Sequence, residues 1–194
     1  MLGKVRSYLR RFRRDDEGSI AVEAILVFPL LFWSVLATFV YFDAFRSQSN
    51  NVKAAYTISD ALSRETGYIT PEYLTSLYRL HEGLTTSNHN TKIRVTIIRY
   101  DADQDKYNVV WSQQRGGAGR LNTPMVEAMR DQLPVMPDNE ILILYQNWIV
   151  YEPIFSIGLE AFTFENMVFT RPRFTPEQLC WNSENDGNYT TATC

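Results

Sequence analysis

An uninterrupted apolar run stands near the start of the chain. Residues 24–42 read AILVFPLLFWSVLATFVYF without a charged side chain, and between Gly18 and Phe42 only Glu23 is ionisable. As a helix, the 25 residues of 18–42 would reach about 37 Å, against a bilayer hydrocarbon core of roughly 30 Å. Twelve residues of the run are Leu, Ile, Val or Phe, whose insertion free energies sum to roughly −5 kcal/mol. The pattern predicts a transmembrane helix over 19–42.

Two other interpretations of the run fit less well. A cleaved secretory signal has an apolar region of about 7 to 15 residues and then a small-x-small site. This run is longer, and the segment FVYFDAFRS at its end offers no such site. The core helix of a soluble domain seldom has 19 uncharged residues directly after a basic cluster. Pro29 removes one helical amide, which membrane helices tolerate, and it predicts a kink.

Helical periodicity continues beyond the run. The first helix is predicted to extend until Gly67, and the positions that keep helical spacing are Val52, Ala55, Tyr56, Ser59 and Leu62. A second helix is predicted to begin with Thr70 as its N-cap and Pro71 in its first turn, and to end at Gly83. A third, short helix is predicted to begin with Thr123 as its cap and to end before Pro134.

Strand patterns occupy most of the remaining chain. They lie at 92–100, 106–113, 140–150 and 162–170, and the polar turn DADQD joins the first two. Alternation places Tyr107, Val109 and Trp111 on one face of the second strand. The stretch 116–119, GGAG, is predicted to be a loop, because no Lys-Ser/Thr pair follows it as in a phosphate loop. Together the elements predict an α+β fold in which a long N-terminal helix packs on an antiparallel sheet of about four strands.

Charge divides the chain at Gly18. Residues 1–17 contain six Lys or Arg and three acidic residues, whereas the rest of the chain carries a net charge of −6, so that the whole is −3. After the apolar run, the only Lys or Arg residues within about 15 positions are Arg46 and Lys53. Because Lys and Arg are retained on the cytoplasmic side, this asymmetry predicts a cytoplasmic leader over 1–18. Residues 43–194 then form a domain across the membrane, in the periplasm of a Gram-negative bacterium.

Both cysteines lie near the end of the chain, at Cys180 and Cys194. They are on the side of the membrane expected to be oxidising, so a disulfide is predicted between them. Closing a loop of this length stabilises by about 3 kcal/mol through the entropy of the unfolded chain. The polar segment NSENDGNYTTAT has few apolar side chains that could hold it otherwise. A redox or metal pair would need closer spacing or histidine partners.

Spacings typical of catalytic sites are absent from the sequence. His81 and His89 are expected to be exposed to solvent and not catalytic, and no Ser-His-Asp, HExxH or CxxC pattern occurs. We therefore expect a protein that is not an enzyme, with no cofactor and no nucleic-acid partner. The basic leader is explained by its role in membrane orientation.

Three aspartates invite a calcium interpretation. Asp101, Asp103 and Asp105 have the spacing that begins an EF-hand loop, but Lys106 and Ser112 stand where that loop needs Gly and Glu. A solvated turn is the better interpretation, and no metal site is expected.

The boundary between the basic block and the apolar run has a specific sequence. Gly18 stands directly before the run and Glu23 lies five positions later, in the string EGSIAVEAILVFPLLFW. This string resembles a prepilin leader, and residues 10–45 resemble the TadE-like family, the minor pilins or pseudopilins of tight-adherence (Flp-type) pilus systems. The RPR at 171–173 is also similar to that family. Flp-type leaders usually have Tyr or Phe where this chain has Ala24, which indicates a minor component and not the major pilin.

The resemblance implies processing and assembly without catalysis. A membrane prepilin peptidase would cut between Gly18 and Ser19, and the new amine would lie one helical turn from Glu23. Glu23 could neutralise that amine or the amine of a neighbouring subunit, and it suits the positive end of the helix dipole. The partners implied are other pilins or pseudopilins, the prepilin peptidase, the inner-membrane assembly platform and membrane lipid. Pilin-like subunits also often end in a disulfide-bounded loop.

The location implied is the bacterial inner membrane, with a single pass and a periplasmic domain, or a surface pilus after assembly. The alternative is an uncleaved single-pass anchor that presents a periplasmic scaffold or binding domain.

Overall fold

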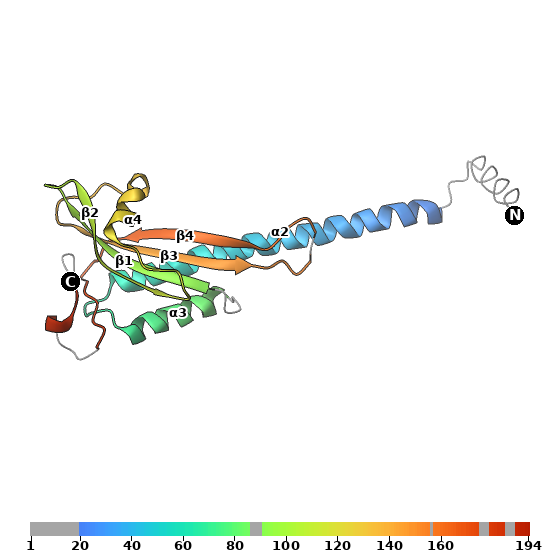
Figure 1. The fold of residues 1–194 in the computed structure, drawn as a ribbon. Helices are drawn as coiled ribbons and strands as arrows, with labels where there is room; N and C mark the ends of the chain where they lie inside the picture. Colours follow the sequence, from blue (N-terminus) through green and yellow to red (C-terminus); the bar gives the residue numbers. More distant parts are fainter. Residues whose placement is uncertain (1–19, 86–90, 156, 175–178, 185–188) are drawn as a thin grey trace, which may run out of the picture. The chain divides into compact units, whose positions relative to one another are not determined.

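The described chain combines helices with one antiparallel sheet (Figure 1). The computed structural model describes residues 20–85, 91–155, 157–174, 179–184 and 189–194. The predicted leader, the Gly18–Ser19 cleavage site and His89 lie outside these residues. The helices are α2 (Ile20–Ser63), α3 (Pro71–Thr85), α4 (Thr123–Ala128) and the 3-10 turns η1 (Arg130–Gln132) and η2 (Tyr189–Thr191); the strands are β1 (Thr91–Asp101), β2 (Lys106–Arg115), β3 (Ile141–Tyr151) and β4 (Phe162–Thr170).

The sheet confirms the predicted α+β class. Its strand order is β2-β1-β3-β4, and every neighbouring pair is antiparallel. All four strands fall within two residues of the predicted bounds, because each predicted segment is rich in the branched and aromatic residues that favour strands. β1 lies in the centre and is paired along most of its length with β2 on one side and β3 on the other.

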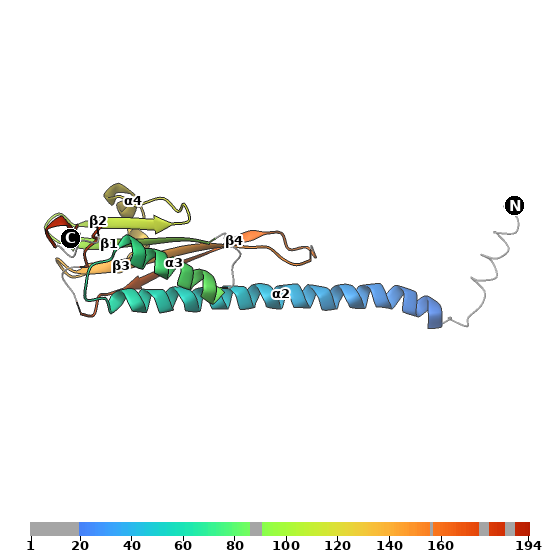
Figure 2. The same cartoon turned by 90° about the horizontal axis from the view of Figure 1, so that it is seen from below.

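Two hydrophobic cores lie on opposite faces of the sheet. In Figure 2, α3 and the second half of α2 cover one face, which we call the inner face, and α4 covers part of the outer face. Among the described residues, the inner core has 16 buried side chains, including those of Ile58, Leu62, Ile97 and Tyr145. The outer core is smaller and is built around Ile98, Val126 and Leu144. The larger inner core therefore depends on helix-on-sheet packing.

A β-bulge in β2 contradicts one predicted face. The register with β1 shifts between Ile97 and Ile98, so that Trp111 pairs with Ile97 whereas Val109 pairs with Ile98. The extra residue, Val110, interrupts the alternation. Trp111 therefore belongs to the inner core, while Val109 packs on the outer core. Tyr107 and Val109 share the outer face, as predicted. The prediction that Trp111 shares that face was wrong, because strict alternation assumes an unbroken ladder.

The second half of α2 buries a single stripe. The buried side chains recur every three or four residues, which is one face of a helix; they include Ala44, Asn51, Ala55, Ile58 and Leu62. The predicted positions Ala55, Ser59 and Leu62 are buried, but Tyr56 is exposed. The helix ends at Ser63, before the predicted stop at Gly67.

The caps of α3 and α4 agree only in part with the sequence prediction. Thr70 caps α3 as expected, since its Oγ1 accepts a hydrogen bond from the amide of Tyr73 at 3.2 Å. The helix passes through Gly83 and ends at Thr85, so Gly83 does not terminate it. α4 is capped by Asn122, whose side chain accepts from the amide of Met125 at 3.0 Å, and not by Thr123.

The chain divides into two compact units. One contains α2 up to Asp43 together with Pro153–Leu159, the connection between β3 and β4. The other contains Ala44–Glu152 and Glu160–Cys194, and therefore the whole sheet. This division falls one residue from the predicted end of the transmembrane segment at Phe42.

Candidate functional site

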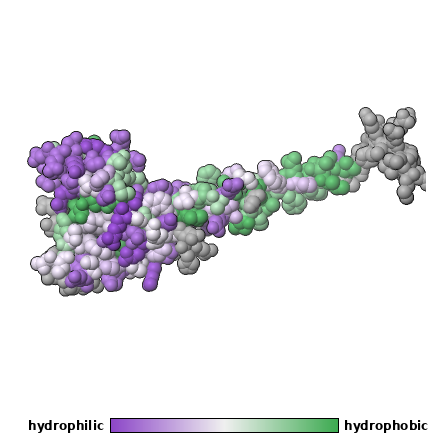
Figure 3. Space-filling view, in the orientation of Figure 1, coloured by the Kyte–Doolittle hydropathy of each residue, from purple (hydrophilic) through white to green (hydrophobic). Residues whose placement is uncertain are grey.

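The first half of α2 is apolar on every face. Four successive residues, Ile25, Leu26, Val27 and Phe28, are 71%, 70%, 57% and 56% exposed. Successive helical residues point about 100° apart, so these four side chains surround the helix axis. Only 11% of the most apolar window of this helix is buried, which is unlike a soluble core helix. Figure 3 shows the hydrophobic residues gathered on this part of α2. The helix is long and apolar enough to cross a membrane.

The polar groups within this apolar stretch are few and mostly satisfied by the helix itself. Ser34 donates its hydroxyl hydrogen to the carbonyl of Leu31, and Thr38 donates to that of Ser34, both at 2.8 Å. Such bonds let a hydroxyl lie among lipid tails, where no water is available. Pro29 lies inside the helix, which is continuous through it; the predicted kink stays a prediction. Glu23 lies in the first turn and is exposed.

Polar pairs join the second half of α2 to the inner face of the sheet. Asn147 on β3 donates to the side-chain oxygen of Asn51, and both residues are buried. Gln48 donates to Asn166 at 3.5 Å. Farther along, Ser59 and Thr170 share a hydroxyl hydrogen bond. Each of the two amide pairs makes one bond, and the other side-chain atom of every amide is buried without a partner within the described residues. Because a one-turn slip of the helix would break all three bonds, the pairs favour this register on the sheet.

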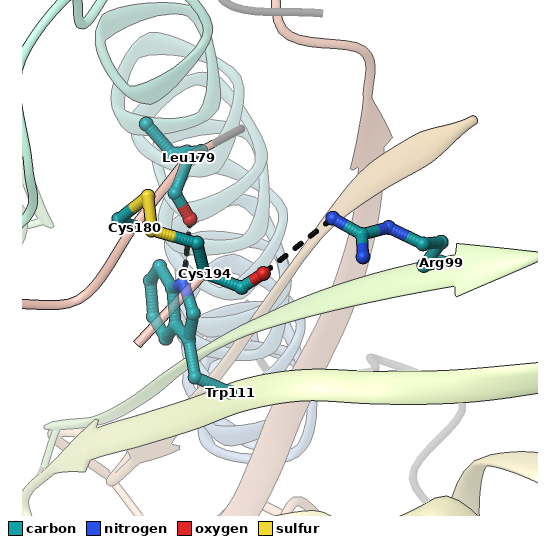
Figure 4. The surroundings of a disulfide bond; sticks show 5 residues. All are labelled: Arg99, Trp111, Leu179, Cys180 and Cys194. Atoms are coloured by element: carbon teal, nitrogen blue, oxygen red, sulfur yellow. Dashed lines mark hydrogen bonds between the residues drawn. A yellow bond between two sulfur atoms is a disulfide. The ribbon is translucent and has the colours of Figure 1, made fainter. Parts of the chain in front are cut away.

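A disulfide closes the C-terminal tail (Figure 4). Cys180 and Cys194 are joined, as the sequence predicted, with their Cα atoms 4.3 Å apart. Next to Cys180, the backbone carbonyl of Leu179 accepts a hydrogen bond from the indole of Trp111 at 2.6 Å. Arg99 donates to the carbonyl of Cys194 at 3.5 Å. The tail is thus attached to two neighbouring strands of the sheet as well as to itself.

Backbone hydrogen bonds hold the first part of the tail independently of the disulfide. The amide of Ile69 donates to the carbonyl of Cys180 at 2.8 Å, and the amide of Asn182 donates to Ile69 at 3.0 Å. Between them, Trp181 is buried against Trp111, with ring centroids 5.8 Å apart. The backbone of Thr193, by contrast, is bonded to Trp181 through two hydrogen bonds of 2.8 Å, and to no other backbone group in the described part of the chain.

His81 contradicts the sequence prediction. It was expected to be exposed, but it is fully buried in α3, and its Nδ1 lies 3.0 Å from the hydroxyl of Tyr145. Its Nε2 has no hydrogen-bond partner within the described part of the chain. Burial lowers the pKa of His81 from 6.5 to about 4 and raises that of Tyr145. The pair is therefore neutral at physiological pH. The signal missed was that residue 81 continues the buried spacing of Leu74 and Leu77.

The aspartate turn is exposed to solvent, as expected, and the structure adds an ion pair. Asp105 contacts Arg130 through a salt bridge and accepts from the hydroxyl of Tyr100 at 2.7 Å. Hydrogen bonds from Tyr100 and Arg130 lower the pKa of the Asp105 carboxyl. Asp101 accepts from the amide of Gln104, which closes the turn. Within the residues that the structure describes, no three His, Cys, Asp or Glu side chains gather closely enough to hold a metal ion.

The RPR segment ties β4 to the end of α2. The guanidinium of Arg173 lies 3.1 Å from Asp60, and its amide donates to the carbonyl of Ser63 at 2.8 Å. Arg171 pairs with Glu140 at 3.1 Å. These exposed pairs each contribute at most about 1 kcal/mol. The RPR segment therefore has a structural role in this chain, since it links β4 to the end of α2. The sequence of the segment alone did not indicate these contacts.

Comparisons with protein-family models, curated protein sequences and solved structures find no match. The resemblance to the TadE-like family thus depends on the sequence alone, namely residues 10–45 and the RPR at 171–173. Glu23 and Pro29 lie in the apolar half of α2, whereas the cysteines lie in the other compact unit.

We expect His81 to make the stability of the domain depend on pH. The neutral ring is buried in the folded state, so between pH 6.5 and pH 4 the unfolded state binds more protons. The free energy of unfolding should therefore fall by about 3 kcal/mol across this range as the pH is lowered. Urea unfolding of the full chain in detergent micelles, followed by tryptophan fluorescence, measures this dependence. His81→Gln should show a shallower slope than the wild type, and His89→Gln should keep the wild-type slope; equal slopes for all three would contradict the assignment.

We expect reduction of the disulfide to loosen the tail unevenly. The amides of Trp181 and Thr193 should exchange faster with solvent, because loop closure contributes about 3 kcal/mol. The amides of Ile69 and Asn182 should stay protected, because they donate to the carbonyls of Cys180 and Ile69 beside the buried Trp181. Hydrogen exchange followed by NMR on the oxidised and reduced protein compares the two pairs. The double variant Cys180→Ser, Cys194→Ser should behave as the reduced protein does; uniform loss of protection would show that the whole tail depends on the disulfide.

Proposed function

We propose that this protein is a TadE-like minor pilin or pseudopilin that acts in the biogenesis of a tight-adherence (Flp-type) pilus. It is held in the bacterial inner membrane by residues 19–42 and presents its sheet domain in the periplasm. A prepilin peptidase removes the leader after Gly18. The protein then acts by packing its helix against other pilins or pseudopilins on the inner-membrane assembly platform, and it carries out no catalysis.

The observation that carries this proposal is the change of character within α2. Up to Phe39 most of its side chains are exposed and apolar on every face, although Val40 is buried, and from Ala44 onward one stripe is buried against an antiparallel sheet. No break separates the two halves. A helix of this kind suits a subunit that leaves the membrane and enters a fibre, since the same apolar surface can pack on lipid or on neighbouring helices. The string around Gly18 and Glu23 adds the processing signal.

Glu23 is the residue to which we assign the assembly role. In the sequence between Gly18 and Phe42 it is the only side chain that is charged at neutral pH, and it lies in the first turn of α2. A carboxylate among lipid tails is costly unless a cation neutralises it. Cleavage before Ser19 supplies such a cation, either in the same chain or in a neighbour. The disulfide of the domain is consistent with an oxidising compartment.

The mature protein is expected to begin at Ser19 and to contain 176 residues. Mass spectrometry of the protein from cells with an active prepilin peptidase tests this directly. Gly18→Ala should leave the leader attached, whereas Gly3→Ala, a control in the same leader, should be processed as the wild type is. A wild-type chain that keeps its Met1 terminus in such cells would refute the processing step and favour the uncleaved single-pass anchor.

Neutralising Glu23 should impair assembly but not insertion. Glu23→Gln keeps the size of the side chain and removes the charge, so the neighbour's amine loses its partner. We expect at least about a tenfold loss of cross-linking between subunits. Glu23→Asp is the matched control that keeps the charge and should retain more of the cross-linking. Membrane fractionation should find all three proteins in the membrane; undiminished cross-linking of Glu23→Gln would refute the assigned role.

A further inference from the structure

The connection between β3 and β4 is an apolar loop. Pro153–Leu159 reads PIFSIGL, and Ile154 and Phe155 are 67% and 43% exposed. Hairpin loops are usually rich in polar residues, because their backbone groups face water. The hydrophobic side chains of this loop are not needed for the cores of the sheet, and none belongs to either core. Their exposure therefore calls for an apolar partner.

The backbone of the loop is locally ordered. The amide of Ile157 donates to the carbonyl of Phe155 at 3.0 Å, and Gly158 adopts a φ of 78°, which glycine tolerates better than other residues. The two strands that lead into the loop carry an aromatic cluster on their inner face. Its members are Tyr151, Phe162 and Phe164, with ring centroids 4.7 to 5.9 Å apart. We call Ile154, Phe155 and Ile157 the hydrophobic tip.

The tip groups with the membrane half of α2 and not with the strands that it connects. Pro153–Leu159 forms one compact unit with the chain up to Asp43. In Figures 1 and 2 the loop runs beside α2. The helix in this unit is apolar on every face, and most of its side chains are exposed like Ile154 and Phe155 of the tip, although Val40 is buried. The apolar medium that would surround this half of the helix can therefore also cover the tip.

We propose that the tip inserts into the interfacial region of the lipid bilayer from which α2 emerges. Ile154, Phe155 and Ile157 enter the boundary between headgroups and acyl chains, a depth at which apolar and aromatic side chains are favoured. Glu152 and Glu160 flank the tip and are exposed, so they stay in the hydrated headgroups. These acids give no attraction to anionic lipid, and insertion depends on apolar contact. This inference rests on the proposed membrane span of α2.

Site-directed fluorescence on the full chain tests the insertion. The label is an environment-sensitive fluorophore attached to Phe155→Cys without reductant, so that the native disulfide stays closed. The protein is reconstituted in phosphatidylcholine vesicles at low density, with nitroxide quenchers on the lipid headgroups or iodide in the water. We expect the headgroup nitroxide to quench this label several-fold more strongly than a label on Val135→Cys, an apolar residue that is 91% exposed in the other compact unit. Iodide should show the opposite order.

Further labels separate the possible failures. Ile154→Cys repeats the measurement at the more exposed tip position, in case Phe155→Cys folds poorly. A label on Ser34→Cys, in the middle of the apolar helix, reports on the span alone, so a failed span is recognised independently of the tip. Tip labels that are as open to iodide as the Val135→Cys label would overturn the inference. Shielding that disappears when the protein is diluted in lipid would also overturn it, because the tip would then contact a second copy. Adding phosphatidylglycerol should not strengthen the quenching; a strong increase would contradict insertion through apolar contact.

Discussion

The packing of one helical stripe on the inner face of the sheet is the interaction on which the rest of the domain depends. From Ala55 to Leu62, α2 contributes side chains that cover the inner core together with Leu74 and Leu77 of α3. Three polar pairs determine where along the sheet that stripe lies: Gln48 with Asn166, Asn51 with Asn147, and Ser59 with Thr170. Apolar packing alone tolerates sliding, since hydrophobic contact has no direction, whereas buried amides lose hydrogen bonds in every other register. The helix therefore leaves the domain at a defined residue.

One half of α2 is expected to lie in lipid and the other half in water. The pattern of apolar residues along the helix changes near the expected boundary between the two. Where water covers the other faces of a helix, three or four apolar residues per two turns are enough to pack it on the core. Before Asp43 all faces are apolar, which water would disfavour and lipid would not. A processed N-terminus with Glu23 would place one charged pair at the far end of that apolar stretch. Anchoring and assembly can then use one surface, because lipid tails and neighbouring pilin helices present similar apolar chemistry.

Local patterns predicted most of the fold, and long-range contacts produced the errors. Strand bounds follow from runs of branched and aromatic residues, and the cap of α3 follows from Thr70 and Pro71. The bulge at Val110 depends on the register with β1, which alternation within β2 does not reveal. The burial of His81 depends on Tyr145, 64 residues away. In the candidate site, the apolar run and the cysteine pair were readable locally, whereas the polar pairs of α2 join residues 96 to 118 positions apart.

A single helical anchor fixes the height of a domain above the membrane but leaves it free to rotate and tilt about the point of exit. If the β3–β4 tip also enters the lipid, two separate contacts define an axis and restrict both motions. The tip connects β3 to β4, and these two strands are hydrogen-bonded to each other. The same strands contact α2, β3 through Asn147 and β4 through Asn166. The constraint would therefore act on the same rigid contact that determines the register of the helix. Such a domain would present one side of its sheet to approaching subunits in the membrane plane before assembly, which lowers the orientational entropy that association must overcome.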